Sequence, residues 1–452
     1  MVKISTLNFG KALIALGVFA NIISANAQQW ENVGSSANIS AGTGSFNNLV
    51  IDTQGNYYVS YYDLSVTKAS VQKFNGTSWS YVGGNAGITT GAATYSSLAI
   101  NPAGNILYYT NQGSGLEVRK FEGSTWSSLP SASSATTNYQ ASAVSSSNVL
   151  FTYGSYGSGT VQRFVNGAWE QVGPANIAGG VPYYAEMVTG TNGKVYVLHN
   201  SSGIKVYENN QTASATDAWT LVGGANVGSS FTEGANATTD IAIGSDNILY
   251  VVYSSPSSNN RRLNVKKFDG TNWVQVGNAD FGISNSLYNV SIAVTPSGKL
   301  YTVASGWAIN SGKNTVYEYN STTNTWVTVG GDFVSDDVAT YNDLQYDAAT
   351  NSLVLTYSQN GIKVKRFSLN SLSVNDVKKN DFNIYPNPTN GMINIKGNST
   401  IKSMEITNTV GQLLNAKFSN QQINLSSFPK GVYFVKINSE DGQQIIKKVI
   451  KN

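Results

Sequence analysis

Side chains able to catalyse a reaction or hold a metal ion are scarce in this sequence. It contains no Cys and a single His, His199, which excludes thiolate sites, disulfides and His-rich metal centres. The densest group of acids comprises Asp332, Asp336, Asp337, Asp343 and Asp347. Paired carboxylates could hydrolyse glycosidic bonds, and the first three could bind Ca²⁺ through oxygen ligands. No D-x-D-x-D-G loop is present, so a solvated acidic loop is the alternative, and no catalytic residue is predicted.

Aromatic residues form the second group with binding potential. One recurs three residues before a short apolar run, at Phe46, Tyr95, Tyr139, Tyr184 and Tyr341, with Tyr288 one residue out of register. Flat Tyr faces with a polar hydroxyl suit stacking on sugars or peptides. The alternative is that these rings pack between structural repeats. Trp307 lies outside the repeat register and is a further candidate for ligand binding.

The composition indicates which elements must position these side chains. Only 12% of the residues are charged, and Gly, Ser, Thr, Asn and aromatic residues are abundant. These residues favour short strands joined by tight turns over helices. A net charge of +3 is too small to indicate nucleic-acid binding, and no cofactor motif is present.

A repeat organises most of the chain. Seven of the eight Trp recur at nearly regular intervals, at Trp30, Trp79, Trp126, Trp169, Trp219, Trp273 and Trp326. Most of them open a short run that ends in Val-Gly, and three further strand patterns lie between successive Trp. Four antiparallel strands in each repeat are typical of propeller blades. The sequence therefore predicts an all-β fold with a seven-bladed β-propeller at residues 28–368.

The two ends of the repeat region complement one another. The first Trp strand, 30–33, has no strands of its own repeat before it, and the last repeat ends at 363–368 without a Trp strand. We expect the first strand to complete the seventh blade, because ring closure removes the exposed sheet edges. A six-bladed ring and an open array are the alternatives.

The first 27 residues have the pattern of a secretory signal peptide. Lys3 and Lys11 precede a nine-residue apolar run at 12–20. Ala25 and Ala27 provide the small residues of a cleavage site. That run is too short to span a bilayer as a helix. No other apolar stretch is long enough, so we expect no transmembrane segment after signal removal.

The rhythm of the repeats stops after residue 368. A polar linker at 369–380 leads to a Lys-rich segment, 381–452, with short alternating strand patterns. This change in composition marks a domain boundary. The alternation predicts a small Ig-like β-sandwich.

The C-terminal segment also carries specific motifs. They are Y-P-N-P, a following Gly, G-V-Y, and a basic final strand, with the motif residues Tyr385, Pro386, Asn387, Pro388, Gly391, Gly431, Val432, Tyr433, Lys447 and Lys448. In this order the motifs resemble the C-terminal sorting domain of the type IX secretion system of Bacteroidetes. The resemblance implies secretion-machinery partners and a secreted or outer-membrane surface location in a Gram-negative bacterium. Released and surface-anchored forms both remain open.

The repeats themselves resemble kelch repeats in overall rhythm and in the spacing of Tyr319 and Trp326, but they lack the paired Gly of kelch units. Taken together, the patterns predict an exported propeller that binds a glycan or a protein and has no cofactor. The alternatives are an extracellular polysaccharide hydrolase or lyase, and a structural surface or adhesion subunit.

Overall fold

The computed structural model describes residues 28–113, 115–180, 182–229, 239–309, 311–370, 382–397, 400–419, 421–440 and 444–452. The expected signal peptide and all but the first two residues of the expected linker lie outside these ranges. The chain divides into two compact units, one ending at Asn370 and the other beginning at Ser371. Helical structure in the described residues is limited to three short 3₁₀ turns, η1 (Tyr156–Ser158), η2 (Val222–Gly224) and η3 (Ser257–Asn259). None of the described helices is long and apolar enough to cross a membrane.

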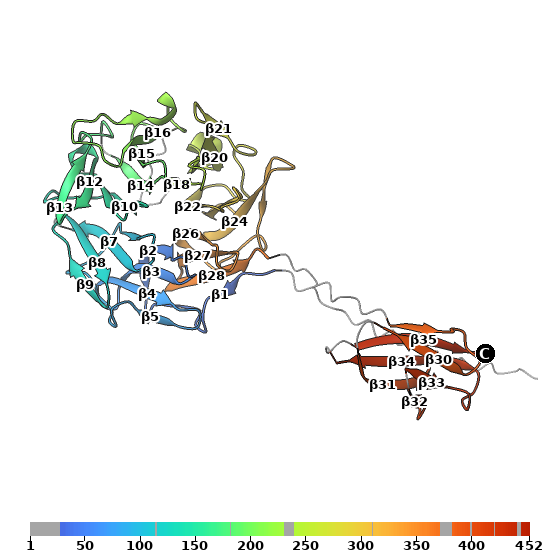
Figure 1. Cartoon of the computed structure of the whole chain (residues 1–452). Helices are drawn as coiled ribbons and strands as arrows, with labels where there is room; N and C mark the ends of the chain where they lie inside the picture. The colour runs from blue at the N-terminus through green and yellow to red at the C-terminus, as the bar shows by residue number, and fades with distance from the viewer. Residues whose placement is uncertain are drawn as a thin grey trace, which may run out of the picture. The chain divides into compact units, whose positions relative to one another are not determined.

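The described residues of the first unit form seven four-stranded antiparallel sheets (Figure 1). We number them 1 to 7 by their innermost strands, which open each sheet in chain order. These inner strands are β2 (Gly44–Ile51), β6 (Ser97–Ile100), β10 (Gln140–Val144), β14 (Tyr183–Thr189), β18 (Thr239–Ile243), β22 (Leu287–Val294) and β26 (Thr340–Asp347).

Sheets 1 to 6 each continue outward through three more strands in chain order. Sheets 1 to 3 contain β3 (Tyr57–Asp63), β4 (Lys68–Phe74), β5 (Trp79–Tyr81), β7 (Ile106–Gly113), β8 (Gly115–Glu122), β9 (Thr125–Ser128), β11 (Leu150–Gly154), β12 (Thr160–Val165) and β13 (Ala168–Val172). Sheets 4 to 6 contain β15 (Lys194–Asn200), β16 (Ile204–Asn210), β17 (Thr220–Leu221), β19 (Leu249–Ser254), β20 (Leu263–Phe268), β21 (Trp273–Gln275), β23 (Leu300–Gly306), β24 (Lys313–Asn320) and β25 (Thr325–Thr328).

Sheet 7 joins the two ends of the repeat region. Its order is β26, β27 (Ser352–Ser358), β28 (Ile362–Ser368) and then β1 (Glu31–Asn32). Glu31 lies opposite Arg366 and Asn32 opposite Lys365 in an antiparallel pair. The expected pairing of the opening segment with the last repeat is therefore confirmed, as are the seven four-stranded units.

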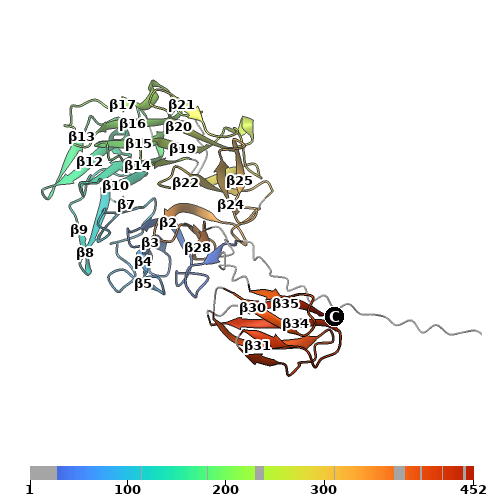
Figure 2. The ribbon, with the colours of Figure 1, turned by 45° about the vertical axis from the view of Figure 1, so that its right-hand side comes forward.

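The inner strands also contact one another in sequence. Each contacts the inner strand of the next sheet, and β26 contacts β2. In Figures 1 and 2 the inner strands β2, β10, β14 and β22 lie nearer the middle of the unit than the outer strands β5, β13 and β21. Apolar clusters fill the spaces between neighbouring sheets: Tyr301 and Val303 of sheet 6, for example, share a core with Leu344 and Leu353 of sheet 7. The sheets thus pack face to face around a common centre.

The recurring Trp and the Val-Gly pairs link successive sheets. The indole N–H of Trp126 donates to the carbonyl of Val82 at 2.8 Å, and that of Trp30 donates to Val329 at 2.9 Å. The Gly after each of these Val residues adopts a positive φ and lies beneath the same indole. Six of the seven recurring Trp make an indole bond of this kind to the preceding sheet, Trp219 being the exception, and Trp30 extends the series across the junction of the two chain ends.

The second unit contains two sheets that share one core. One sheet has the order β29 (Asn383–Tyr385), β30 (Met392–Lys396), β33 (Gln422–Asn424) and β32 (Lys417–Ser419). The other has the order β31 (Ile401–Asn408), β34 (Gly431–Ser439) and β35 (Gln444–Lys451). Ile393 and Ile423 of the first sheet pack with Ile406 and Val435 of the second. The sheets therefore bury their apolar faces against one another, as expected for strands of alternating polarity.

Candidate functional site

The seven inner strands surround a cavity of about 460 Å³. Every inner strand contributes residues to its lining, so the site depends on the whole first unit. Three acids line the cavity, Glu186, Asp240 and Asp343, whereas its lining includes no Lys, Arg or His. The volume is within the usual range for small-molecule sites.

The predicted aromatic residues adopt an unusual backbone conformation where the inner strands begin. Phe46, Tyr95, Tyr184 and Tyr341 have φ values of 52°, 47°, 48° and 55°. Around Phe46, Tyr184 and Tyr341 the pairing with the second strand of the sheet shifts register, which marks a β-bulge. A bulky residue with positive φ is rare, and a bulge redirects its side chain. The strained backbone at these positions therefore sets the direction of the aromatic side chains.

Five aromatic side chains form a continuous series along the cavity. The distances between ring centroids are 4.6 Å for Tyr341 and Phe46, 5.1 Å for Phe46 and Tyr95, 5.3 Å for Tyr95 and Tyr139, and 5.3 Å for Tyr139 and Tyr184. All five residues are half-buried and line the cavity. We call this series the aromatic rim. The structure brings these five predicted residues together, while their role in binding stays a prediction.

The other two predicted aromatic residues lie elsewhere. Tyr288 is not part of the cavity lining, and the guanidinium of Arg261 lies 5.8 Å from its ring centre. The residue with positive φ in sheet 6 is Asn289, at 52°. Trp307 is 46% exposed in the connection between β23 and β24. Neither side chain contributes to the aromatic rim.

Side-chain hydrogen bonds hold the strained positions from the neighbouring sheet. Four such bonds follow one pattern. The donor is the side chain of the polar residue directly after the strained or aromatic residue of one sheet, and the acceptor is the backbone carbonyl of the equivalent strained or aromatic residue in the sheet before it. The pairs are Ser96 to Phe46 (3.1 Å), Gln140 to Tyr95, Asn342 to Asn289 (2.8 Å) and Asn47 to Tyr341 (2.6 Å). These bonds fix the rim to adjacent sheets as well as to its own strands.

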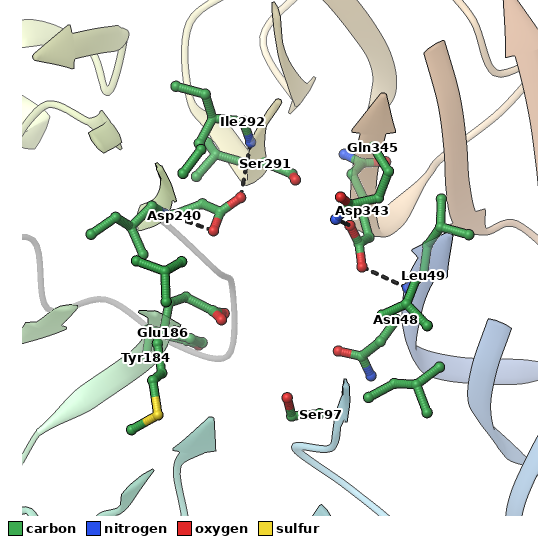
Figure 3. A pocket seen from close by; sticks show the side chains of 18 of the residues that line it. Asn48, Leu49, Ser97, Tyr184, Glu186, Asp240, Ser291, Ile292, Asp343 and Gln345 are labelled. Carbon is green, nitrogen blue, oxygen red and sulfur yellow. Dashed lines mark hydrogen bonds between the residues drawn. The ribbon is translucent and has the colours of Figure 1, made fainter. Parts of the chain in front are cut away.

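A second set of polar side chains lies on the inner strands, two residues after the positions of the aromatic residues. It comprises Asn48, Ser97, Glu186, Asp240, Ser291 and Asp343 (Figure 3). Asp343 accepts a hydrogen bond from the backbone N–H of Leu49 at 2.7 Å, and Asp240 accepts one from Ile292 at 2.9 Å. Ser97 and Ser291 accept corresponding bonds from Ser142 and Leu344, at 3.2 Å and 3.1 Å. The innermost strand of a sheet has unpaired N–H groups, and these side chains satisfy some of them.

The three carboxyl groups ionise less readily than usual. Burial within the ring of strands raises the pKa of Asp240 to about 7 and that of Asp343 to about 6, although hydrogen bonds to each carboxylate partly oppose this. Burial and repulsion from Asp240 and Asp343 also raise the pKa of Glu186 well above its ordinary value. The Glu186 side chain is nevertheless exposed to the cavity (Figure 3), so it can meet a ligand.

The predicted Ca²⁺ ligands do not belong to this cavity. Asp332, Asp336 and Asp337 lie exposed in the connection between β25 and β26. Within the described part of the chain, no three His, Cys, Asp or Glu side chains are grouped so that they could hold a metal ion.

Sequence reasoning missed Glu186 and Asp240 and did not place Asp343 in a site. The signal was a polar residue two positions after the recurring aromatic residue. That pattern is visible in Tyr184 and Glu186, and in Tyr341 and Asp343. It is obscured in sheet 5, where Asp240 has no such aromatic residue before it.

The sorting motifs of the second unit meet at its final strand. The Asn387 side chain donates to the carbonyl of Lys448 at 2.7 Å and accepts from the N–H of Ile450 at 2.9 Å. Thr389 pairs with Lys451 in a short parallel bridge. Tyr385, Pro386 and Pro388 flank this contact, Gly391 lies against Ser426, and Gly431, Val432 and Tyr433 open β34 beside the strand that carries Lys447 and Lys448. The separate motifs thus form one structural feature.

Residues 383–452 match the family model of the secretion system C-terminal sorting domain. The protein is therefore exported by the type IX secretion system of a Gram-negative bacterium, and it is either secreted or located on the cell surface. The sorting domain interacts with the secretion machinery. The match covers the second unit alone.

The other comparisons concern the fold or find nothing. No curated protein matches the chain. A solved structure titled U3-55K has 10% sequence identity and a TM-score of 0.48, and covers 75% of this chain and 98% of its own. A protein of unknown function from Dyadobacter fermentans DSM 18053 has 11% identity and a TM-score of 0.42, with the same shares covered.

Proposed function

We propose that the first unit is a seven-bladed β-propeller closed by its first strand, and that it binds a glycan or protein ligand in the central cavity. The seven sheets would be the blades, with kelch-like rhythm but without the kelch glycines. Contacts between consecutive inner strands, including β26 with β2, support this architecture. A rigid scaffold with a central cavity suits recognition at the cell surface.

The observation that carries the proposal is the aromatic rim. Strained positions of this kind cost on the order of 1–3 kcal/mol each and persist where the surrounding structure holds them. Here hydrogen bonds from neighbouring sheets hold the carbonyls of Phe46, Tyr95 and Tyr341. Packing between sheets would not require such strain at a cavity mouth. The half-buried rings of the cavity lining offer a ligand apolar area together with polar hydroxyls.

Binding can be tested with the purified protein on arrays of glycans and of surface proteins. We expect a ligand whose affinity falls about ten-fold when Tyr139→Ala removes the middle ring of the rim, as is common for aromatic residues at the centre of a site. The matched variant Trp307→Ala removes an exposed Trp outside the cavity and should bind normally. Loss of binding in Trp307→Ala alone would place the site on the loops and contradict the proposal.

A second candidate function has one observation in its favour. Asp240 and Asp343 have pKa values of about 7 and 6, so one can be protonated while the other is ionised near neutrality. Glycoside hydrolases use such a pair. However, both oxygens of Asp240 already accept backbone N–H groups, which favours a structural role. Release of reducing ends from polysaccharides by the protein, abolished in Asp240→Asn, would establish hydrolysis instead of simple binding.

A further inference from the structure

The charges of the central cavity are of one sign. Glu186, Asp240 and Asp343 lie on three different inner strands and face one space (Figure 3), and its lining has no basic residue. Burial, followed by repulsion from Asp240 and Asp343, raises the pKa of Glu186. A ligand with a positive charge would relieve this repulsion, whereas an anionic ligand would increase it.

The aromatic rim would also attract a positively charged ligand. The face of an aromatic ring carries negative potential, and it attracts a cation within about 6 Å of the ring centre. The rim presents five such rings in contact, Phe46 and four Tyr, beside the carboxylates in the same cavity. Groups of aromatic residues that enclose a cation recognise ammonium groups in this way.

Two side chains of the cavity lining contain buried hydrogen-bond acceptors that are not used by the described residues. Asn47 and Gln140 are 6% and 7% exposed, and both line the cavity. Each donates its amide N–H to a rim carbonyl, while its side-chain oxygen has no hydrogen-bond partner among the described residues. Among the described residues, burial and the charges of Asp240 and Asp343 act on the Glu186 carboxylate, and no hydrogen bond does. Buried acceptors without partners are costly, but the oxygens of Asn47 and Gln140 are closed off from the cavity, so Glu186 is the acceptor that a ligand can reach.

The arrangement favours an organic cation over a metal ion. Asp240 and Asp343 already accept backbone N–H groups, which leaves Glu186 as the carboxylate available to a ligand. Within the described residues no group of three suitable side chains is placed to hold a metal. Hard cations such as Ca²⁺ need six to eight oxygen ligands. A diffuse ammonium group instead requires one counter-charge and several ring faces.

We propose that the ligand presents an ammonium group, which enters the aromatic rim and pairs with Glu186. This inference rests on the proposed binding role of the central cavity and specifies its ligand class. The Glu186 carboxylate offers an acceptor for a primary ammonium, and the rings of the aromatic rim serve a methylated one. The group can belong to a free amine or to a basic side chain.

The test uses calorimetry with the purified full-length protein and two pairs of probes. Choline is compared with its neutral isostere 3,3-dimethylbutan-1-ol, and Nα-acetyl-lysine amide with Nα-acetyl-norleucine amide. We expect at least one cation to bind ten-fold more tightly than its neutral partner. Preference for choline indicates a free methylated amine, and preference for the lysine derivative indicates a side chain. Equal binding of charged and neutral partners overturns the inference.

Variants locate the effect. Glu186→Gln keeps the side-chain volume and loses no hydrogen bond with a described residue, so it should weaken cation binding about ten-fold without affecting the fold. Tyr139→Leu should weaken it similarly, while the matched variant Trp307→Leu removes an exposed ring outside the cavity and should bind normally. Unchanged cation affinity in Glu186→Gln contradicts the inference. If a neutral array ligand binds and depends on Tyr139 while no ammonium probe binds, the ligand class is wrong but the proposed function stands.

Discussion

In the proposed function, Glu186 serves ligand binding at a cost to the stability of the fold. Its carboxylate lies in a cavity with two other acids and has no hydrogen-bond partner in the described part of the chain. Asp240 and Asp343 are different, because each accepts a backbone N–H of an inner strand, and this hydrogen bond offsets part of the cost of burying the carboxylate. A side chain that is destabilising in the free protein and exposed to a cavity is characteristic of a functional site.

Glu186→Gln is expected to stabilise the protein near neutral pH. The folded-state pKa of Glu186 is raised, so the folded protein retains a proton that the unfolded chain releases above about pH 4.3. The Glu186 contribution to stability therefore falls as pH rises from there through the folded-state pKa. Thermal unfolding should give a midpoint about 2–4 °C higher for the variant at pH 7.5, with the difference vanishing near pH 4.

The matched control for this prediction is Glu122→Gln. Glu122 lies outside the cavity, and its pair with Lys120 is at the surface, where such pairs contribute little. The Glu122→Gln variant should show no pH-dependent gain in thermal stability. A pH-independent effect of Glu186→Gln would indicate a packing change and contradict the electrostatic explanation.

At the scale of elements, the sequence predicted strands well because the repeat is local. The Trp, Val and Gly positions mark each outer strand, and the indole hydrogen bonds and glycine contacts explain their spacing. Trp169 departs from the pattern, since Leu129-Pro130 replaces Val-Gly, yet its indole still donates to the Pro130 carbonyl at 2.7 Å. The carboxylate site was less predictable, because it combines single residues that lie 54 and 103 residues apart in the sequence.

The contact between Gly and Trp predicts unequal effects at two adjacent glycines. Gly83 and Gly84 have φ values of 85° and 86°, so Ala is strained at both. A Cβ on Gly83 would also lie 2.9 Å from the Trp126 ring, whereas a Cβ on Gly84 meets nothing within 4 Å. Gly83→Ala should cost about 2–4 kcal/mol of unfolding free energy and Gly84→Ala about 1 kcal/mol. Equal losses in denaturant unfolding would show that the Trp contact is unimportant.

At the scale of the whole molecule, export and the proposed binding role belong to different units. The second unit has its own core and carries the sorting motifs, while the first contains the cavity. This division explains why the sequence revealed the destination of the protein more readily than its ligand. Export depends on a contiguous segment with several motifs, but the cavity depends on the closure of a ring.

Removal of residues 371–452 should separate these two roles. We expect the remaining chain to fold, because the sheets and the apolar clusters of the first unit are complete without the second. Cell fractionation should find it in the periplasm, since it lacks the sorting domain that directs passage across the outer membrane. Its melting temperature should match that of the first unit in the full protein. Delivery of the truncated chain to the surface would contradict the sorting assignment.

Closure by the first strand can be tested with a disulfide, because the chain has no Cys of its own. Asn32 and Lys365 are direct partners in the β1–β28 pair. The neighbouring bond from Val33 N–H to the Val364 carbonyl makes them a non-hydrogen-bonded pair, whose Cα atoms lie about 4.5 Å apart, close enough for a disulfide. The double variant Asn32→Cys/Lys365→Cys should oxidise fully. By linking the ends of a very long loop, the bond should add about 2–4 kcal/mol of stability and raise the melting temperature.

The control variant Asn32→Cys/Arg366→Cys places the second thiol on the opposite face of β28 and should remain reduced. Oxidation of the shifted pair in preference to the aligned one would mean that β1 pairs in another register, and both the ring and the cavity that it encloses would then require revision.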